Sequence, residues 1–66
     1  MNEELAHVRC DCKSQLRFVS EYLRLVEENL GKLNEKTVDA VEMSLVNAGI
    51  HAKRAFELLE RGKTQQ

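Results

Sequence analysis

The chain lacks proline and tryptophan altogether, and its 66 residues include only three glycines and two cysteines. Proline and glycine disfavour helix more than any other residues, so their scarcity favours helix along most of the chain. Two cysteines one residue apart cannot build the disulfide framework that supports many small secreted domains. No apolar run approaches the roughly 20 residues that cross a bilayer. These absences leave a single small helical domain, residues 1–66, as the expected organisation.

Charge and the first residues narrow the function classes further. The formal net charge is −1, and 32% of the residues are charged. This balance indicates neither a strongly basic nucleic-acid-binding chain nor a disordered acidic tail. The opening residues, MNEEL, lack the basic start and the apolar stretch of a secretory signal. We therefore expect the protein in the cytoplasm.

Apolar residues recur every three or four positions in two long segments, which is the spacing of helices with one apolar face. The first helix is predicted over about residues 3–30, with Asn2 as its N-cap and Gly31 as a left-handed residue that ends it. The second is predicted over about residues 35–61, with Asn34 as its N-cap. The short connection indicates an all-α, antiparallel two-helix hairpin.

The apolar arcs are broader than two facing helices can cover. Beside the main row of each helix runs a second apolar strip, formed by Phe18, Tyr22 and Leu25 on the first helix and by Met43, Ile50 and Leu58 on the second. A chain of this size buries only about 60% of its unfolded surface and usually needs further stabilisation. We therefore expect a homodimer that forms a two-fold symmetric four-helix bundle. A monomeric hairpin with scattered exposed apolar residues is the alternative.

The predicted core and dimer interface comprise residues from the main apolar rows and their flanks. They are Val8, Cys12, Leu16, Phe18, Val19, Tyr22, Leu23 and Val26 on the first helix, and Leu45, Ala48, Ala52, Ala55, Phe56 and Leu59 on the second. A charge placed at Val19 or Val26 should collapse the fold, because burying an unpaired charge is costly.

The two cysteines are expected on opposite sides of the first helix, because two residues turn it by about 200°. Cys12 is predicted to be a small core residue, and Cys10 to lie on the solvated side. They cannot share a metal ion or a disulfide while the helix persists. The sequence also places no nucleophile or carboxylate beside His51. It therefore predicts no catalytic site, no metal and no cofactor.

Basic residues share an arc of the first helix on the side away from the apolar row. They are Arg9, Lys13, Arg17 and Arg24, and together with Cys10 they form the predicted partner-binding surface. In a two-fold dimer this stripe occurs twice, and paired basic stripes can follow a phosphate backbone. A solvated face that nearby glutamates offset is the simpler alternative.

The segments CDCKSQLRFVSEYLRLVEENL and AVEMSLVNAGIHAKRAFELLERG together resemble the dimerisation and histidine-phosphotransfer domain of sensor histidine kinases. The first helix of that family carries a box of the type His-Asp-x-Lys/Asn-Asn-x-Leu around a phosphoryl-accepting histidine. Asp11, Lys13, Gln15 and Leu16 match the box in kind, and the resemblance covers about residues 7–61. It implies a helical hairpin that dimerises.

The departure from the box concerns its reactive position. Cys10 stands where the family has its phosphoryl-accepting histidine, and Ser14 replaces the usual polar amide. The resemblance thus implies a non-enzymatic scaffold that does not transfer phosphate but binds a response regulator, a kinase or another copy of such a bundle.

A second resemblance is to the Rop family of plasmid copy-number proteins, on the turn KLNE and the segment MSLVNAG. It implies an RNA-binding regulatory dimer in which Lys13, Arg17 and Arg24, with Phe18, contact RNA by its shape more than its sequence. The leading expectation from the sequence remains a protein-interaction and dimerisation module in a two-component type of signalling, with RNA binding as the alternative.

Overall fold

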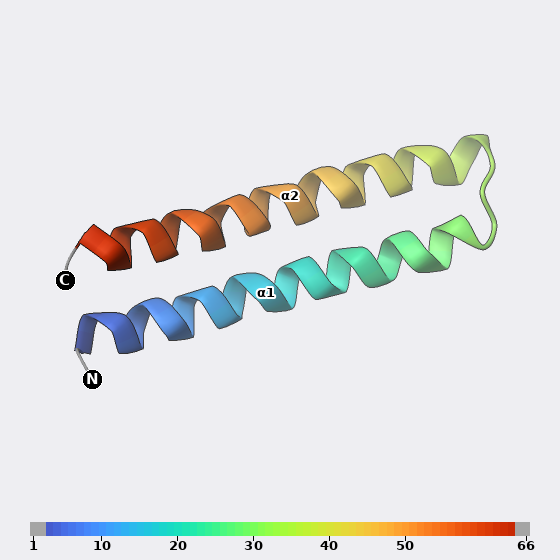
Figure 1. The fold of residues 1–66 in the computed structure, drawn as a ribbon. Helices are drawn as coiled ribbons and strands as arrows, with labels where there is room; N and C mark the ends of the chain where they lie inside the picture. Colours follow the sequence, from blue (N-terminus) through green and yellow to red (C-terminus); the bar gives the residue numbers. More distant parts are fainter. Residues whose placement is uncertain (1–2, 65–66) are drawn as a thin grey trace.

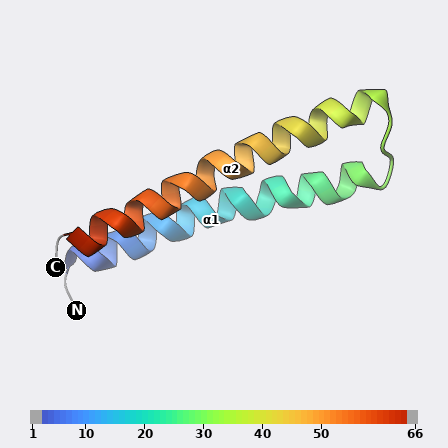
Figure 2. The ribbon, with the colours of Figure 1, turned by 45° about the horizontal axis from the view of Figure 1, so that its top comes forward.

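The computed structural model describes residues 3–64, which form two helices, α1 (Glu3–Leu30) and α2 (Glu35–Thr64). The helices run antiparallel and lie side by side (Figure 1). Figure 2 shows the same pairing after a 45° turn. We call the end where α1 begins and α2 finishes the open end, and the end with the connection 31–34 the loop end. The predicted all-α hairpin is confirmed.

Asn34 caps the first turn of α2, as the sequence predicted. Its side-chain oxygen accepts hydrogen bonds from the backbone N–H groups of Lys36, at 2.8 Å, and Thr37, at 3.1 Å. The Thr37 hydroxyl in turn accepts the Asn34 N–H at 2.8 Å. These reciprocal bonds satisfy donors that have no partner within the helix. The cap therefore fixes where α2 begins.

The end of α1 differs from the prediction. No described residue has a positive φ, so the expected left-handed conformation of Gly31 is wrong. The helix instead ends in a turn in which the Lys32 N–H donates to the Asn29 carbonyl at 3.1 Å. The Asn29 side chain also donates to the Leu25 carbonyl at 2.8 Å. The expected N-cap of α1, Asn2, lies outside the described residues.

Helix α2 continues to Thr64, beyond the predicted end near residue 61. Gly62 packs against α1 near the open end, where a Cβ atom would lie 3.4 Å from Leu5 and 3.5 Å from Val8. A Cβ atom at Gly62 would thus be in ordinary van der Waals contact with these two side chains, which shows that the position faces α1.

The space between the helices is filled by small and β-branched side chains. The buried apolar residues are Val8, Cys12 and Val26 from α1 and Val41, Ala48 and Ala55 from α2. The thiol of Cys12 lies 3.6 Å from the Ala55 carbonyl oxygen, which places these residues opposite each other. Yet no large side chain among the described residues is fully buried. The hairpin alone has a thin core.

The molecule is elongated, with extents of 48 × 15 × 9 Å and a radius of gyration of 15.2 Å. A compact domain of this length has a radius of gyration of about 11 Å. The chain exposes 5184 Å², whereas a compact monomer of its mass exposes about 4,300 Å². The single hairpin therefore exposes roughly a fifth more surface than expected for its size. Within the described residues, neither helix combines the length and apolarity needed to cross a membrane.

Candidate functional site

One open side of the hairpin carries a continuous set of large apolar side chains, which we call the leucine face. It consists of Leu16, Leu23 and Leu30 on α1 and Val38, Leu45, Phe56 and Leu59 on α2. The leucines stand four positions after inward residues, for example Leu16 after Cys12 and Leu45 after Val41. Each residue turns the helix by about 100°, so a side chain four positions after an inward residue points about 40° to one side of it. In an antiparallel pair this rotation brings both rows to the same side.

Every member of the leucine face is exposed in the single hairpin. Their relative exposures run from 38% at Val38 to 63% at Phe56. The remaining exposed large apolar residues, Phe18, Leu33, Met43, Val46 and Ile50, are spread over the other side, the back of α2 and the connection. The predicted interface residues Leu16, Leu23, Leu45, Phe56 and Leu59 therefore lie outside the contact between α1 and α2.

The leucine face ends in an apolar groove at the open end of the hairpin. The groove has a volume of about 350 Å³, and its lining includes Leu5, Val8, Phe56, Leu59 and Gly62. Glu60 and Lys63 stand at its edge and form an ion pair at 3.2 Å. Gly62 lines the groove without contributing a side chain to it.

The opposite side of the hairpin closes over a cluster of rings, and we call it the aromatic face. It consists of Phe18, Met43 and Ile50 at the surface, with Tyr22, Leu25 and His51 half-buried beneath. The His51 ring stacks on Phe18, with centroids 4.6 Å apart and planes 17° from parallel. It also stacks on Tyr22, with centroids 5.8 Å apart and planes at 16°.

A hydrogen bond fixes the His51 ring within this cluster. Its Nδ1 lies 2.6 Å from the Gln15 side-chain oxygen. Because an amide oxygen only accepts, Nδ1 carries the proton and donates it. The bond joins the two helices, so it contributes to their register. Within residues 3–64, the hydrogen-bond and ring partners of His51 are Gln15, Phe18 and Tyr22, none of which forms a catalytic pair with it.

Sequence reasoning missed this cluster, because it treated His51 as a helix residue without a partner. The contact between Gln15 and His51 follows only from the register of the hairpin, that is, from which residues of α1 lie opposite which residues of α2. Once Cys12 stands opposite Ala55, one turn along each helix brings Gln15 to His51.

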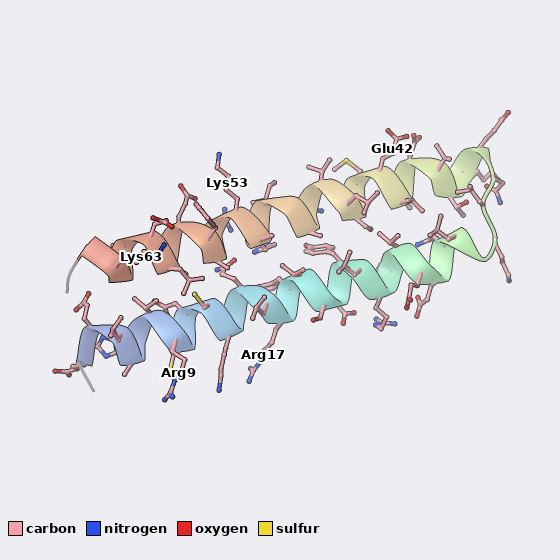
Figure 3. The ribbon with its side chains drawn as sticks, in the orientation of Figure 1. Arg9, Arg17, Glu42, Lys53 and Lys63 are labelled. Atoms are coloured by element: carbon pink, nitrogen blue, oxygen red, sulfur yellow. The ribbon has the colours of Figure 1, made fainter. Side chains whose placement is uncertain are left out.

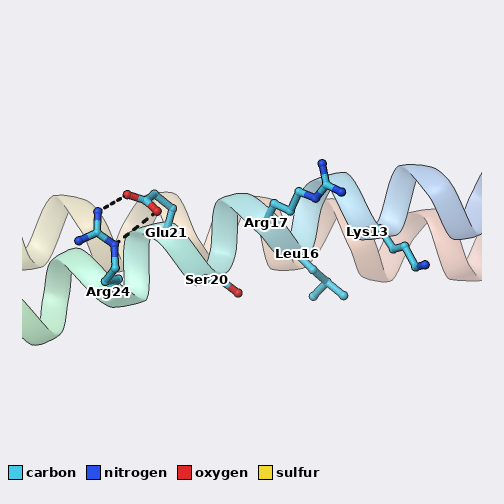
Figure 4. Close-up of a pocket in the computed structure, with 6 residues that line it drawn as sticks. All are labelled: Lys13, Leu16, Arg17, Ser20, Glu21 and Arg24. Atoms are coloured by element: carbon cyan, nitrogen blue, oxygen red, sulfur yellow. Dashed lines mark hydrogen bonds and ion pairs between the residues drawn. The ribbon is translucent and has the colours of Figure 1, made fainter.

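The basic residues of α1 are not equivalent in the structure. Arg24 forms ion pairs with Glu21 and Glu28 on its own helix. The hydrogen bond and charge of Arg24 lower the pKa of Glu21, and Glu21 raises the pKa of Arg24. Figure 4 shows the Arg24 guanidinium turned along the helix toward Glu21. Arg24 is therefore largely neutralised by its own helix.

Lys13 and Arg17, by contrast, have no carboxylate partner in the described part of the chain. They border a shallow groove of about 560 Å³ that also includes Leu16 and Ser20 and is formed by α1 alone. In Figure 4, Lys13 points with Leu16 and Ser20 to one side of the helix, and Arg17 points to the other. Figure 3 shows Arg9 and Arg17 projecting from α1 away from α2.

The cysteines lie where the sequence placed them. Cys12 is buried against α2, Cys10 is exposed, and both are free thiols. Ser14 donates a hydrogen bond to the Cys10 carbonyl at 3.3 Å, within the helix. Between residues 3 and 64, no group of three histidine, cysteine or acidic side chains is close enough to hold a metal ion.

Comparison with models of protein families, with curated protein sequences and with solved structures found no match for this chain.

Proposed function

We propose that the chain is a non-enzymatic protein-interaction module that acts as a homodimeric four-helix bundle. The observation that carries this proposal is the leucine face, where seven large apolar side chains gather on one side and remain exposed. A second copy brings an identical face, and self-complementary contact of identical faces is how two-fold interfaces form. The excess surface of the single hairpin, roughly 900 Å² over a compact monomer, matches the ~800 Å² that each partner of a stable interface buries.

The energetics favour such a dimer. Burial of a large apolar side chain stabilises by ~1.5–3 kcal/mol, so covering side chains that are about half exposed yields ~1 kcal/mol each. Two leucine faces together contribute on the order of 14 kcal/mol. Association costs ~4–15 kcal/mol in lost freedom. A cost of ~6 kcal/mol, in the lower part of that range, leaves ~8 kcal/mol and a dissociation constant on the order of micromolar.

The outer side of α1 stays uncovered when two leucine faces meet. It carries the cation Arg17, which has no partner in the described residues and suits an acidic protein surface. We propose this side as the docking surface for a protein partner. The resemblance to the sensor kinase hairpin makes a kinase or a response regulator the first class of partner to test. The exposed free thiol of Cys10 fits a reducing compartment such as the cytoplasm.

Light scattering across the micromolar range tests the proposal. The expected mass at high concentration is that of two chains, each of 7.6 kDa. A chain that keeps the mass of one copy throughout would contradict the dimer.

The partner is tested by titrating the dimer with a purified response regulator or kinase from the source organism. Arg17→Glu, which leaves the charges beside the leucine face unchanged, should weaken binding while leaving the dimer mass unchanged, and Glu57→Lys on the far helix serves as the matched control. Nucleic acid in the absorbance spectrum of the freshly purified protein, bound with a steep salt dependence, would instead establish an RNA-binding role.

A further inference from the structure

We infer that the second copy lies on the leucine face antiparallel to the first, so that the loop end of each hairpin covers the open end of the other. This orientation rests on the proposed dimer and specifies how its two copies meet. Two features of the leucine face carry it, the distribution of charge along its edges and the position of its groove.

Charged residues bordering the leucine face change sign along the hairpin. The half toward the open end carries Arg9 and Lys13 on α1 and the ion pair of Lys63 with Glu60 on α2, so its net charge is positive. The half toward the loop end carries Glu27 on α1 and Glu35 and Glu42 on α2. All seven are exposed. Figure 3 shows Arg9 and Lys63 near the open end and Glu42 toward the loop end. The face therefore has a basic half and an acidic half.

This polarity distinguishes the two ways in which two copies can meet. If both loops lay at the same end, basic halves would face each other and acidic halves would face each other. In the antiparallel arrangement each basic half faces an acidic half. Like charges brought together across an interface oppose association, and complementary charges favour it. The charges thus select the antiparallel dimer.

The shape of the face leads to the same orientation. The open end has the groove between Leu5, Val8, Phe56 and Leu59, which nothing in the single hairpin fills. The loop end has Leu30, with an exposed fraction of 52%, and Val38, with 38%. A two-fold axis near the middle of the hairpin brings the loop end of the second copy over this groove. Leu30 and Val38 of the second copy then fill it, and each copy completes the other.

Distance measurement between spin labels tests the orientation. A single label at Lys32→Cys, in a Cys10→Ser/Cys12→Ala background, reports the separation of the two loop ends. The antiparallel dimer should give a distance that approaches the 48 Å length of the hairpin. A distance of about 20–25 Å would place the loops together, because packed helices lie only about 8–10 Å apart, and would overturn the inference.

A label at Ser20→Cys in the same background is the matched control. Ser20 borders the leucine face near the middle of the hairpin, so its two labels should lie close together in either orientation. A short Ser20 distance with a short Lys32 distance contradicts only the orientation. The absence of any intermolecular distance at both positions contradicts the dimer itself, and with it the proposed function.

Charge reversal provides a second test that needs no label. Glu27→Lys/Glu42→Lys and Arg9→Glu/Lys13→Glu should each weaken dimerisation on the order of tenfold, because each brings like charges together. The variant with all four changes should recover the affinity, since its two halves are again opposite. Reversal variants that dimerise as tightly as the unmodified chain would contradict the antiparallel arrangement. Helix content by circular dichroism shows that each variant remains folded.

Discussion

The two open sides of the hairpin come from the same two helices but differ in how their apolar side chains are packed. On the aromatic face, Phe18 and Tyr22 stack on His51, and Gln15 bonds to the same ring, so the surface closes over a contact between the helices. On the leucine face, large side chains stand on both helices and remain exposed. Contacts between the helices therefore hold the aromatic face together within one chain, although Phe18, Met43 and Ile50 remain exposed, whereas the leucine face is exposed on both helices.

The comparison shows why exposure of a single side chain is a poor guide to its role. Leu45 is 48% exposed and Ile50 is 43% exposed, yet they lie on opposite sides. The difference lies in the neighbours, because Leu45 belongs to a row of apolar side chains on the leucine face, whereas Ile50 lies on the side where the rings of Phe18, Tyr22 and His51 stack. Continuity, more than the exposed fraction, indicates an interface.

The largest effect is expected from a charge placed between the helices, beneath both faces. Val26→Asp puts a carboxylate at a residue that is only 8% exposed. We expect loss of more than ~3 kcal/mol in the free energy of unfolding, which a hairpin of this size does not survive. Circular dichroism during urea titration measures it. A midpoint equal to that of the unmodified chain would show that Val26 does not face α2.

The next effect separates the two faces directly. Leu23→Asp places a charge in the middle of the leucine face and should abolish the dimer, with a fall in helix stability that follows from the lost association. Ile50→Asp, at a residue of similar exposure, is the matched control and should leave the dimer mass intact. Light scattering compares the two. Equal effects of both substitutions would remove the distinction between the faces.

A smaller effect is expected from the aromatic face. His51→Ala removes the ring stacking and the bond from Gln15, and should lower the free energy of unfolding by ~1–2 kcal/mol without changing the mass of the assembly. His51→Phe retains the rings but not the hydrogen bond, and should recover part of the loss. If His51→Ala instead dissociates the dimer, the aromatic face takes part in the interface.

The smallest effect is expected from Cys10→Ser, because the Cys10 thiol is exposed on the outer side of α1. The change in unfolding free energy should stay within ~0.5 kcal/mol. A loss of several kcal/mol, on the scale of truncating a core side chain, would mean that α1 presents a different side to α2.

Sequence periodicity was sufficient for the helices, for the cap at Asn34 and for the opposite placement of Cys10 and Cys12, because each depends on residues within one or two turns. It could not separate the contact within the hairpin from the face beside it. The spacing assigns Leu16 to the apolar row and leaves out its neighbour Gln15. Only the register of the two helices shows that Gln15 faces inward toward His51. The position of Gly62 against Leu5 and Val8 likewise depends on residues from both helices.

Residue-resolved footprinting with a photoreactive carbene source tests most directly whether the leucine face is covered. Labelling of Leu23 and Leu45 is compared with that of Ile50 and Met43, each normalised to the same residue in the denatured chain. In the single hairpin all four side chains are exposed, at 43–59%. We predict that Leu23 and Leu45 are strongly protected at concentrations where the dimer forms, while Ile50 and Met43 label freely. Equal labelling of both pairs would show that the leucine face is open to solvent and would contradict the account.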